Sequence, residues 1–514
     1  MDIPVPAIFA ISLASTLYDS PRNGTPSLET LWLFLLRLVA LLLLRAVYWI
    51  CIYPYHVSPL RHLPGPKDHH FLLGQTVNQH RSGDPTQPFV SWVRQWPAAN
   101  MIRYFSLGNS ESLLVTGLDA YRQVLVEKPN SFRKPVAFQK MLQPITGKGL
   151  VLSEGDEHRF HRRMMGRGSP IDNYFDDQIR TQKDSCIVEC VASYSSITLD
   201  IIGLAGMGVD FRNLETPSLF HQNMQRIFDL SPLGEVLMLM SAYVPIRLLP
   251  LRENRTYKEA LADIRRLLRE LIRERVREMT TPEGVLLETD RQDILSYMIR
   301  TYKMEKAYDE QVILELSLNL LIGGHETSSN ALLWATDAMA RNPQIQHRLR
   351  REIRCMLKDT PDPGFTEIDG LGYLDNFIKE VFRVYSPIVS SPRVAVEDVI
   401  ISGTRVPKGT TIMILPAVFH MNTSIWGSDA ESFNPDRWEH AGRTMDSHAF
   451  APFLHGPHQC IGRVFSEVEF KLLLVELVAK FQFEAVSLDK VALFNPSMAL
   501  RPKGYKVKIS RWLG

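Results

Sequence analysis

Cysteine is scarce in this sequence, with only five among 514 residues. A chain of this length cannot build a disulfide framework from so few cysteines, and an odd number leaves at least one thiol free. Because structural disulfides belong to oxidising compartments, we expect the part of the chain that carries its chemistry to lie in a reducing one.

A large excess of one charge sign is also absent. Lys and Arg total 58 and Asp and Glu total 56, which gives a net charge of +2. Proteins that bind nucleic acid by neutralising phosphates carry a clear basic excess, so we expect no nucleic-acid partner. The chain is 45% hydrophobic and 22% charged, which is typical of a globular protein and excludes a disordered or low-complexity one.

One long apolar run stands near the start of the chain. Residues 31–53 read LWLFLLRLVALLLLRAVYWICIY, broken only by Arg37 and Arg45. As a helix they would extend about 34 Å, enough to cross a hydrocarbon core of roughly 30 Å. A buried core helix is the alternative, whereas a cleaved signal peptide is disfavoured because no basic segment precedes the run and no small-residue cleavage site follows it. We therefore predict a single transmembrane helix over 31–53.

The flanking segments predict how this helix is oriented. Proline is frequent in 54–66, PYHVSPLRHLPGP, and because proline fixes φ we expect a stiff, extended hinge there. Basic residues on this side, Lys67 among them, favour a cytosolic location for residues 67–514 and a lumenal one for residues 1–30. Asn23-Gly-Thr would then be a lumenal glycosylation sequon. The chain is thus expected to be a membrane-tethered cytosolic globule.

Residues 67–514 form one continuous block without a Ser/Gly linker or an internal repeat. Apolar residues recur at helical spacing between Tyr257 and Glu278, and the stretch from Gln311 to Arg341 is apolar on nearly every side. Strand-like runs are short, at 112–117 and twice within 396–418. The pattern predicts a mainly α fold with a small β subdomain.

The long apolar stretch changes character at its midpoint, where the chain reads Gly323-Gly-His-Glu326-Thr327-Ser. Two glycines and several polar residues inside a buried helix conflict with helix propensity, and such conflicts tend to mark functional sites. The glycines would remove side-chain bulk where another group approaches the backbone. A zinc-binding HExxH motif is excluded because position 329 is Ser.

A lone cysteine near the C-terminus has a specific setting. The chain reads Phe453-Leu-His-Gly456-Pro-His458-Gln-Cys460-Ile-Gly462-Arg and then continues in a helical pattern. Cys460 would lie at a helix N-terminus, where the helix dipole and free N–H groups favour a thiolate. Gly456 permits a tight turn, and Gly462 would let the new helix pass close to a flat object. A buried, inert thiol is the alternative, but the spacing Phe-x-x-Gly-x-x-x-Cys-x-Gly is highly specific.

This spacing resembles the haem-thiolate loop of the cytochrome P450 family. Three further segments resemble that family in order and spacing: Glu380-Val-Phe-Arg383 its ExxR helix, residues 433–438 its meander, and residues 323–328 its oxygen-binding groove. The hinge also resembles the proline-rich segment of microsomal members, so the resemblance extends over about residues 59–508. It implies the haem-thiolate fold, with Glu380, Arg383 and Arg437 as a buried charged triad that braces the cysteine loop.

By this resemblance the cofactor is haem b, and Cys460 is the axial thiolate ligand of its iron. The resemblance implies haem contacts for other residues of the cysteine loop and for residues before it, with His158 standing where the usual Trp-x-x-x-Arg pattern has Trp. These residues are Phe453, Gly456, His458, Gly462, Arg393, His158 and Arg162. No Cys-x-x-Cys-His occurs in the sequence, so the haem is expected to be held by ligation and packing and not by thioethers.

The predicted reaction follows from the same resemblance. A thiolate trans to dioxygen favours O–O cleavage, and we expect Thr327 to hydrogen-bond to the dioxygen while Glu326 relays protons. The chain is therefore predicted to be a monooxygenase that inserts one oxygen atom from O2 by hydroxylation or epoxidation. The alternatives are a P450-type isomerase or dehydratase that needs no external O2, and a haem-based sensor or carrier. The Glu326–Thr327 pair favours the monooxygenase.

The resemblance also implies partners for the chain. No flavin-binding segment follows Cys460, so the expected electron donor is a separate NADPH-dependent flavoprotein reductase in the endoplasmic reticulum membrane, as for microsomal members. The segments that line the pocket in relatives, 141–152, 233–240, 388–391 and 494–500, are apolar here. We expect a lipophilic substrate that arrives from the membrane. The chain resembles fungal members that oxidise terpenoid or polyketide intermediates of secondary metabolism.

Overall fold

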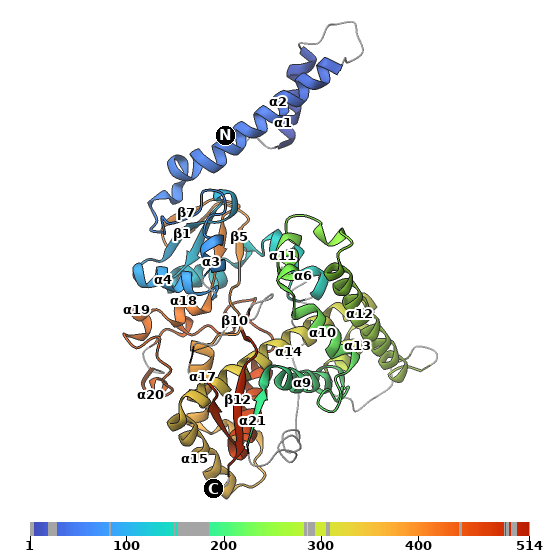
Figure 1. The fold of residues 1–514 in the computed structure, drawn as a ribbon, viewed down its shortest axis with the longest axis vertical. Coiled ribbons are helices and arrows are strands. Elements are labelled where there is room, and N and C mark those ends of the chain that lie inside the picture. Colours follow the sequence, from blue (N-terminus) through green and yellow to red (C-terminus); the bar gives the residue numbers. More distant parts are fainter. Residues whose placement is uncertain are drawn as a thin grey trace.

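The protein is described here from a computed structural model that covers residues 5–18, 28–81, 84–148, 150–152, 185–281, 285, 293–304, 309–441, 445–487, 489, 493–494 and 501–512. Within these ranges helices dominate and strands are short. Figure 1 shows a globular body from which one helical arm projects. The predicted mainly α fold with a small β subdomain is confirmed.

The body is built from helices of very different lengths. The longest are α14 (Glu310–Arg341) and α12 (Arg252–Glu278), followed by α21 (Arg463–Lys480) and α15 (Pro343–Asp359). The shorter helices are α3 (Thr76–Arg81), α4 (Gln87–Gln95), α5 (Leu118–Arg122), η4 (Gln123–Glu127), α6 (Val136–Thr146), α9 (Cys190–Ile202), α10 (Leu219–Phe228), α11 (Pro232–Ser241), α13 (Ile294–Met304), α16 (Phe365–Asp369), α17 (Gly372–Val384), α18 (Pro416–His420), α19 (Thr423–Trp426) and α20 (Arg437–Ala441).

The strands form small sheets at the margins of the helical body (Figure 1). One sheet has the order β1-β2-β8-β5-β3, in which β2 and β8 are parallel and the other neighbours antiparallel. A second has the order β4-β12-β9, and two further pairs are β6-β7 and β10-β11. The bounds are β1 (Met101–Phe105), β2 (Glu111–Val115), β3 (Phe132–Arg133), β4 (Ser185–Glu189), β5 (Arg393–Ala395), β6 (Val399–Ile401), β7 (Thr404–Val406), β8 (Thr411–Met413), β9 (Phe481–Ala485), β10 (Leu493–Phe494), β11 (Arg501–Pro502) and β12 (Lys506–Arg511).

Helix α14 runs through the middle of the body and joins two hydrophobic clusters. Its buried apolar residues up to Ile322 pack in one cluster with α12 and α13. From Ala331 onwards they pack in another cluster with α17 and α21. The glycine-rich segment 323–328 therefore lies at the junction of the two clusters, where neither one supplies apolar neighbours on every side.

The helices and strands predicted from periodicity are confirmed. Residues Ala260, Ile264, Leu268 and Ile272 follow at every fourth position and are all buried on one face of α12. Strand β2 overlaps the first strand-like run, 112–117, and β6 and β8 lie within 396–418. The last two strands belong to different sheets, because β6 pairs with β7 whereas β8 pairs with β2 and β5.

The N-terminal arm contains more helix than the sequence predicted. The apolar run continues as one helical segment over Leu28–Val57, made of α2 (Leu28–Val47) and the π-helix η1 (Tyr48–Val57). A further helix, α1 (Val5–Tyr18), occupies a region for which no element was predicted. In Figure 1, α1 lies beside the half of α2 that is farther from the body.

The prediction of an extended hinge is wrong for its first part. The helix runs through Pro54 to Val57, and Pro59–His62 forms a 3-10 turn. Burial explains the difference, since Leu60 packs into the cluster beneath the five-stranded sheet. The Arg103 N–H also donates a hydrogen bond of 2.9 Å to the Pro64 carbonyl. This segment thus packs on the body.

Candidate active site

The glycine-rich segment of α14 remains helical, so the polar residues at its midpoint do not interrupt the helix. The Thr327 hydroxyl donates a hydrogen bond of 2.5 Å to the Gly323 carbonyl one turn earlier. A Cβ added to Gly323 would meet no heavy atom within 4 Å. Gly323 and Thr327, four residues apart, share one face of the helix, and that face borders open space.

Glu326 lies on a different part of the same turn. It is 8% exposed and lines a cavity of about 400 Å³. The cavity wall is rich in polar side chains from the end of β4 and from α9, α10 and α14, including Glu189, Ser195, Gln225, Ser329 and Asn330. This volume is many times the roughly 30 Å³ that one water occupies in the liquid. The Glu326 carboxyl therefore borders a space that can hold a chain of waters.

The cysteine loop closes on itself just before α21. The Cys460 N–H donates a hydrogen bond of 2.9 Å to the Phe453 carbonyl, and Gly462 is the N-cap residue of α21. Gly456 has a φ of +79°, and a Cβ at this position would lie 2.1 Å from the Leu125 carbonyl oxygen of η4. Only glycine fits such a left-handed, closely packed position. The spacing of the motif is therefore explained by the packing of the loop.

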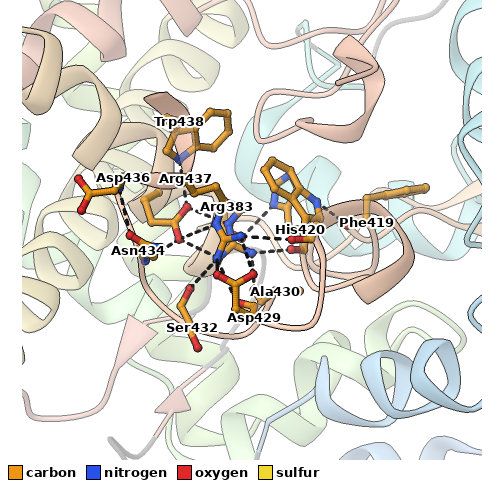
Figure 2. A network of polar contacts seen from close by, with 12 residues as sticks. Arg383, Phe419, His420, Asp429, Ala430, Ser432, Asn434, Asp436, Arg437 and Trp438 are labelled. Carbon is orange, nitrogen blue, oxygen red and sulfur yellow. Dashed lines mark hydrogen bonds and ion pairs between the residues drawn. The ribbon is translucent and has the colours of Figure 1, made fainter. Parts of the chain in front are cut away.

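Arg383 and Glu380 form a buried ion pair on α17, and both side chains are 0% exposed. Two guanidinium nitrogens of Arg383 donate to the two carboxylate oxygens of Glu380, each at 2.8 Å. The remaining donors of Arg383 bind main-chain carbonyls, so all five of its N–H groups are used. These carbonyls belong to His420, Ala430 and Ser432, and Figure 2 shows how they converge on Arg383.

Arg437 completes the triad from the start of α20. Its Nε lies 3.4 Å from a Glu380 oxygen, and its Nη2 is 2.9 Å from Asp429. The Trp438 ring N–H and the Asn434 N–H also donate to Glu380, at 3.0 Å and 2.8 Å. The triad thus fixes the loop from 429 to 438 onto α17 (Figure 2).

His420, which the sequence did not single out, connects the triad to the cysteine loop. Its Nδ1 bonds to the Arg383 carbonyl at 3.0 Å, and its Nε2 accepts the Ala451 N–H at 3.0 Å, two residues before Phe453. Since Nε2 must accept, the ring is neutral with its proton on Nδ1. Burial, followed by the nearby charge of Arg383, lowers the pKa of His420 to about 3.

The buried, neutral ring of His420 should make the stability of the fold sensitive to acid. Because its folded pKa lies below the ordinary value of 6.5, the unfolded chain binds more protons between pH 6.5 and about 3, and stability falls as the pH drops through that window. The free energy of unfolding should fall by up to about 1.4 kcal/mol per pH unit because of this one group. His420→Gln retains an acceptor but cannot titrate, so its denaturant midpoint should fall less between pH 7 and pH 5 than that of the unsubstituted protein. Equal falls would contradict this assignment.

The other predicted site residues are spread over the same region. Phe453 packs edge-on against Phe382 of α17, with ring centroids 5.4 Å apart. Arg393, at the start of β5, is 4% exposed and donates to the Ser391 hydroxyl at 2.9 Å. His458 is half-buried in the cysteine loop. The segment that holds His158 and Arg162 lies outside the described residues.

Comparison with known proteins decides the family. The sequence model of the family described as cytochrome P450 matches residues 64–509. The chain belongs to the cytochrome P450 family. It is 31% identical to cytochrome P450 monooxygenase sphH of Aspergillus fumigatus over 96% of both chains, and 31% identical to cytochrome P450 monooxygenase FUM15 of Gibberella moniliformis over 91% of this chain and 90% of that one.

A third relative, cytochrome P450 monooxygenase ALT8 of Alternaria alternata, is 28% identical over 84% of this chain and 86% of that one. These findings identify this P450 as a haem-thiolate monooxygenase and support neither the isomerase nor the dehydratase alternative. The cofactor is haem with a cysteine thiolate as the axial ligand.

The described side chains of this P450 fit such a cofactor. The Cys460 side chain is exposed although its loop lies against the core, and a Cβ on Gly462 would meet only the Cys460 Sγ, at 3.9 Å. On α14, the open face at Gly323 and Thr327 leaves comparable room. An exposed cysteine and a helix face that carries glycine and the small Thr327 side chain leave room for a flat, bulky iron porphyrin.

Glu469 is a second residue that sequence reasoning missed. It lies on α21, nine residues after Cys460, and accepts a hydrogen bond of 2.7 Å from the Ser328 hydroxyl of α14. Burial raises the pKa of Glu469 to about 8, so the carboxyl is protonated at neutral pH. This bond links the helix that follows the cysteine to the residue next to Thr327.

Proposed function

We propose that this P450 oxidises a lipophilic intermediate of secondary metabolism, with Cys460 as the thiolate ligand of its haem. The observation that carries the proposal is the cysteine loop, in which Cys460 has an exposed sulfur at the start of α21 and a main-chain bond to Phe453. In the balanced reaction, the substrate, O2, NADPH and a proton are converted into the oxygenated substrate, water and NADP⁺. Arg393, His158, Arg162 and His458 are the candidates for binding the haem propionates.

The haem supplies O2 activation when bound, and the protein supplies the ligand and the protons. Cys460 donates electron density through its thiolate. Thr327 presents its hydroxyl on the open face of α14, and its bond to the Gly323 carbonyl fixes where that hydroxyl lies. Glu326 borders the cavity of about 400 Å³, so its carboxyl can take protons from solvent and pass them toward the Thr327 side of the helix.

Electrons would come from a membrane-bound NADPH-dependent flavoprotein reductase. The helical arm supports this proposal, because an 18-residue stretch within Leu28–Val57 has a mean hydropathy of 2.2 and none of that stretch is buried. We propose that α2 crosses the endoplasmic reticulum membrane once and holds the catalytic domain on the cytosolic side, with Asn23 on the lumenal side as a glycosylation site. A shared membrane would keep the two proteins close to each other.

The region around α11 supports a lipophilic substrate. Within 233–240, Leu237 and Met238 are buried, but most of the apolar side chains point outward. With the residues that follow they form an exposed apolar surface: Leu233, Val236, Leu239, Met240, Tyr243, Val244, Leu248 and Leu249. It lies at the end of the body from which α2 projects (Figure 1). Such a surface suits contact with lipid, from which an apolar substrate could enter.

A panel assay tests the substrate class. Membranes that contain the full chain and a flavoprotein reductase are given NADPH, ¹⁸O2 and either terpenoid and polyketide compounds or soluble polar metabolites. We expect one ¹⁸O atom in a product of the lipophilic group, dependent on NADPH and on the reductase. Better turnover of a polar metabolite would contradict the proposed substrate class.

The Thr327 hydroxyl is expected to control how efficiently electrons reach the product. In Thr327→Ala, product formed per NADPH should fall by about a hundredfold, the lower end of the 10²–10⁴-fold range that general acid–base groups contribute, and the missing electrons should appear as hydrogen peroxide. Thr327→Ser keeps the hydroxyl and is the matched control. Because the Thr327 hydroxyl bonds, among the residues that the structure describes, only to the Gly323 carbonyl of its own helix, both variants should bind haem normally. Unchanged coupling in Thr327→Ala would contradict the proposed role.

A further inference from the structure

The helix α1 packs along α2 in the N-terminal arm. Phe9 of α1 meets Phe34 of α2 edge-on, with ring centroids 5.3 Å apart and planes at 83°. On α1 the buried residues are Ile8, Ser12 and Thr16, which follow at every fourth position and so form one stripe. The partly covered residues of α2 between Thr30 and Leu41 recur at the same helical spacing: Thr30, Phe34, Arg37, Leu38 and Leu41. The two stripes are the contacting faces of an antiparallel helix pair.

The outer surface of this pair is apolar. On α1 the exposed apolar residues include Phe9, Ile11 and Leu13, each more than 40% exposed. On α2 the exposed large hydrophobic residues are mostly leucine, with tryptophan and valine among them: Leu28, Leu31, Trp32, Leu33, Leu35, Leu36, Val39, Leu42, Leu43, Leu44 and Val47. The one exposed charge on α2 is Glu29 in the first turn. Helix α1 contains no charged residue. Water would be an unfavourable environment for such a surface on both helices, whereas lipid acyl chains match it.

We propose that α1 and α2 form a helical hairpin inside the bilayer, so that α1 returns from the lumenal turn toward the cytosolic face. The anchor would then hold the N-terminus on the same side as the catalytic domain, unlike the single pass with a lumenal N-terminus expected from the sequence. In this hairpin, the exposed side of α1 contacts lipid and its buried stripe contacts α2.

The lengths permit this path. Helix α2 has 20 residues, about 30 Å at 1.5 Å per residue, which matches the hydrocarbon thickness of a bilayer. Helix α1 has 14 residues, or about 21 Å. Packed along α2 from the lumenal interface, it would therefore extend through most of the hydrocarbon core toward the cytosolic interface.

The contact residues are those that membrane helices use to associate. Lipid provides no hydrophobic force that joins two helices, so close packing through small residues and shared polar groups drives their pairing. Ser12 and Thr16 supply small polar residues on the buried stripe of α1, and the Thr16 hydroxyl bonds to the Ser12 carbonyl at 2.8 Å. Arg37 is partly covered on the side of α2 that faces α1. The hairpin thus shields from lipid part of a charge that a lone helix would expose.

The topology can be read from glycosylation of an N-terminal extension. The full chain, with Asn23→Gln to remove its own sequon, carries a hydrophilic tag with one Asn-x-Thr acceptor before Met1 and is expressed in yeast. We expect the tag to remain unglycosylated and to be digested by protease added to sealed microsomes. As a control, the same tag replaces residues 1–18, so that α2 alone sets the topology and the tag should be glycosylated. A glycosylated, protease-protected tag on the full chain would overturn the proposal.

Crosslinking tests the packing of the two helices separately. In a Cys51→Ser background, Phe9→Cys with Phe34→Cys should be joined by a short, membrane-permeant bismaleimide. The control pair is Ala10→Cys with Phe34→Cys, because Ala10 is exposed and lies two residues from both Ile8 and Ser12, on the side of α1 opposite the buried stripe; it should react much less. Equal or absent crosslinking in both pairs would contradict a packed hairpin. Neither readout depends on haem or on turnover, so failure of the proposed enzymatic function would leave both tests intact.

Discussion

Cys460→Ser is expected to abolish the far-red-shifted Soret band that a thiolate-ligated haem gives when reduced and bound to carbon monoxide. A serine hydroxyl does not supply the electron density of a thiolate at neutral pH, so monooxygenase activity should fall to background. The spectrum of membranes that contain the full chain is sufficient for this measurement, and no substrate is needed.

Another cysteine of the same chain provides the matched control. Cys355 is a free, exposed cysteine on α15, remote in sequence from the cysteine loop. Cys355→Ser should keep the thiolate band at full intensity. This result would show that the loss of a thiol elsewhere in the chain does not affect haem ligation. If Cys460→Ser retained the thiolate band, a different residue would be the iron ligand, and the roles proposed for the cysteine loop would be wrong.

The cysteine loop and the charged triad could be anticipated because their residues lie close together in sequence or at fixed spacing. The importance of Gly456 could be predicted from the sequence because its role is a local one. Its turn leaves no room for a Cβ beside Leu125, so the backbone requires glycine there. Glu380 and Arg383 are one helical turn apart and therefore meet wherever α17 forms. The motif spacing thus records local geometry.

His420 and Glu469 could not be found in this way, because their partners are far away in sequence. His420 bonds to residues 37 positions before it and 31 positions after it, and no local pattern encodes that meeting. Glu469 left a weak signal, since the residues four positions before and after it on the same face of α21 are the apolar Phe465 and Leu473. A lone acid on such a face indicates a buried partner, here Ser328.

Helix α1 was overlooked for a different reason. Its 14 residues contain no charge, but they are too few for the roughly 20 that an isolated spanning helix needs. Only its packing against α2 indicates how so short a helix can be accommodated. The anchor therefore depends on a tertiary contact that hydropathy alone does not report.

Removing the charge of Arg383 should be the most destabilising substitution in the triad. Arg383→Leu leaves the Glu380 carboxylate buried without its main partner, a change that costs about 3–5 kcal/mol in comparable buried pairs. It also removes donors from the carbonyls of His420, Ala430 and Ser432. We expect little haem-loaded protein, measured as the carbon-monoxide spectrum per amount of chain. Arg383→Lys, which keeps the charge but not the five-donor fork, should give an intermediate yield.

Two further variants separate charge from connectivity. Arg405 pairs with Asp398 on the surface, where both side chains are largely exposed, so Arg405→Leu should leave the haem yield unchanged. Replacing Glu380 and Arg383 together by leucine removes the unpaired charge, yet it still deprives three main-chain carbonyls of their donors. The double variant should therefore remain as poor in haem as Arg383→Leu. Recovery to the unsubstituted level would show that Arg383 serves only to neutralise Glu380, and that the link through His420 to the cysteine loop contributes nothing.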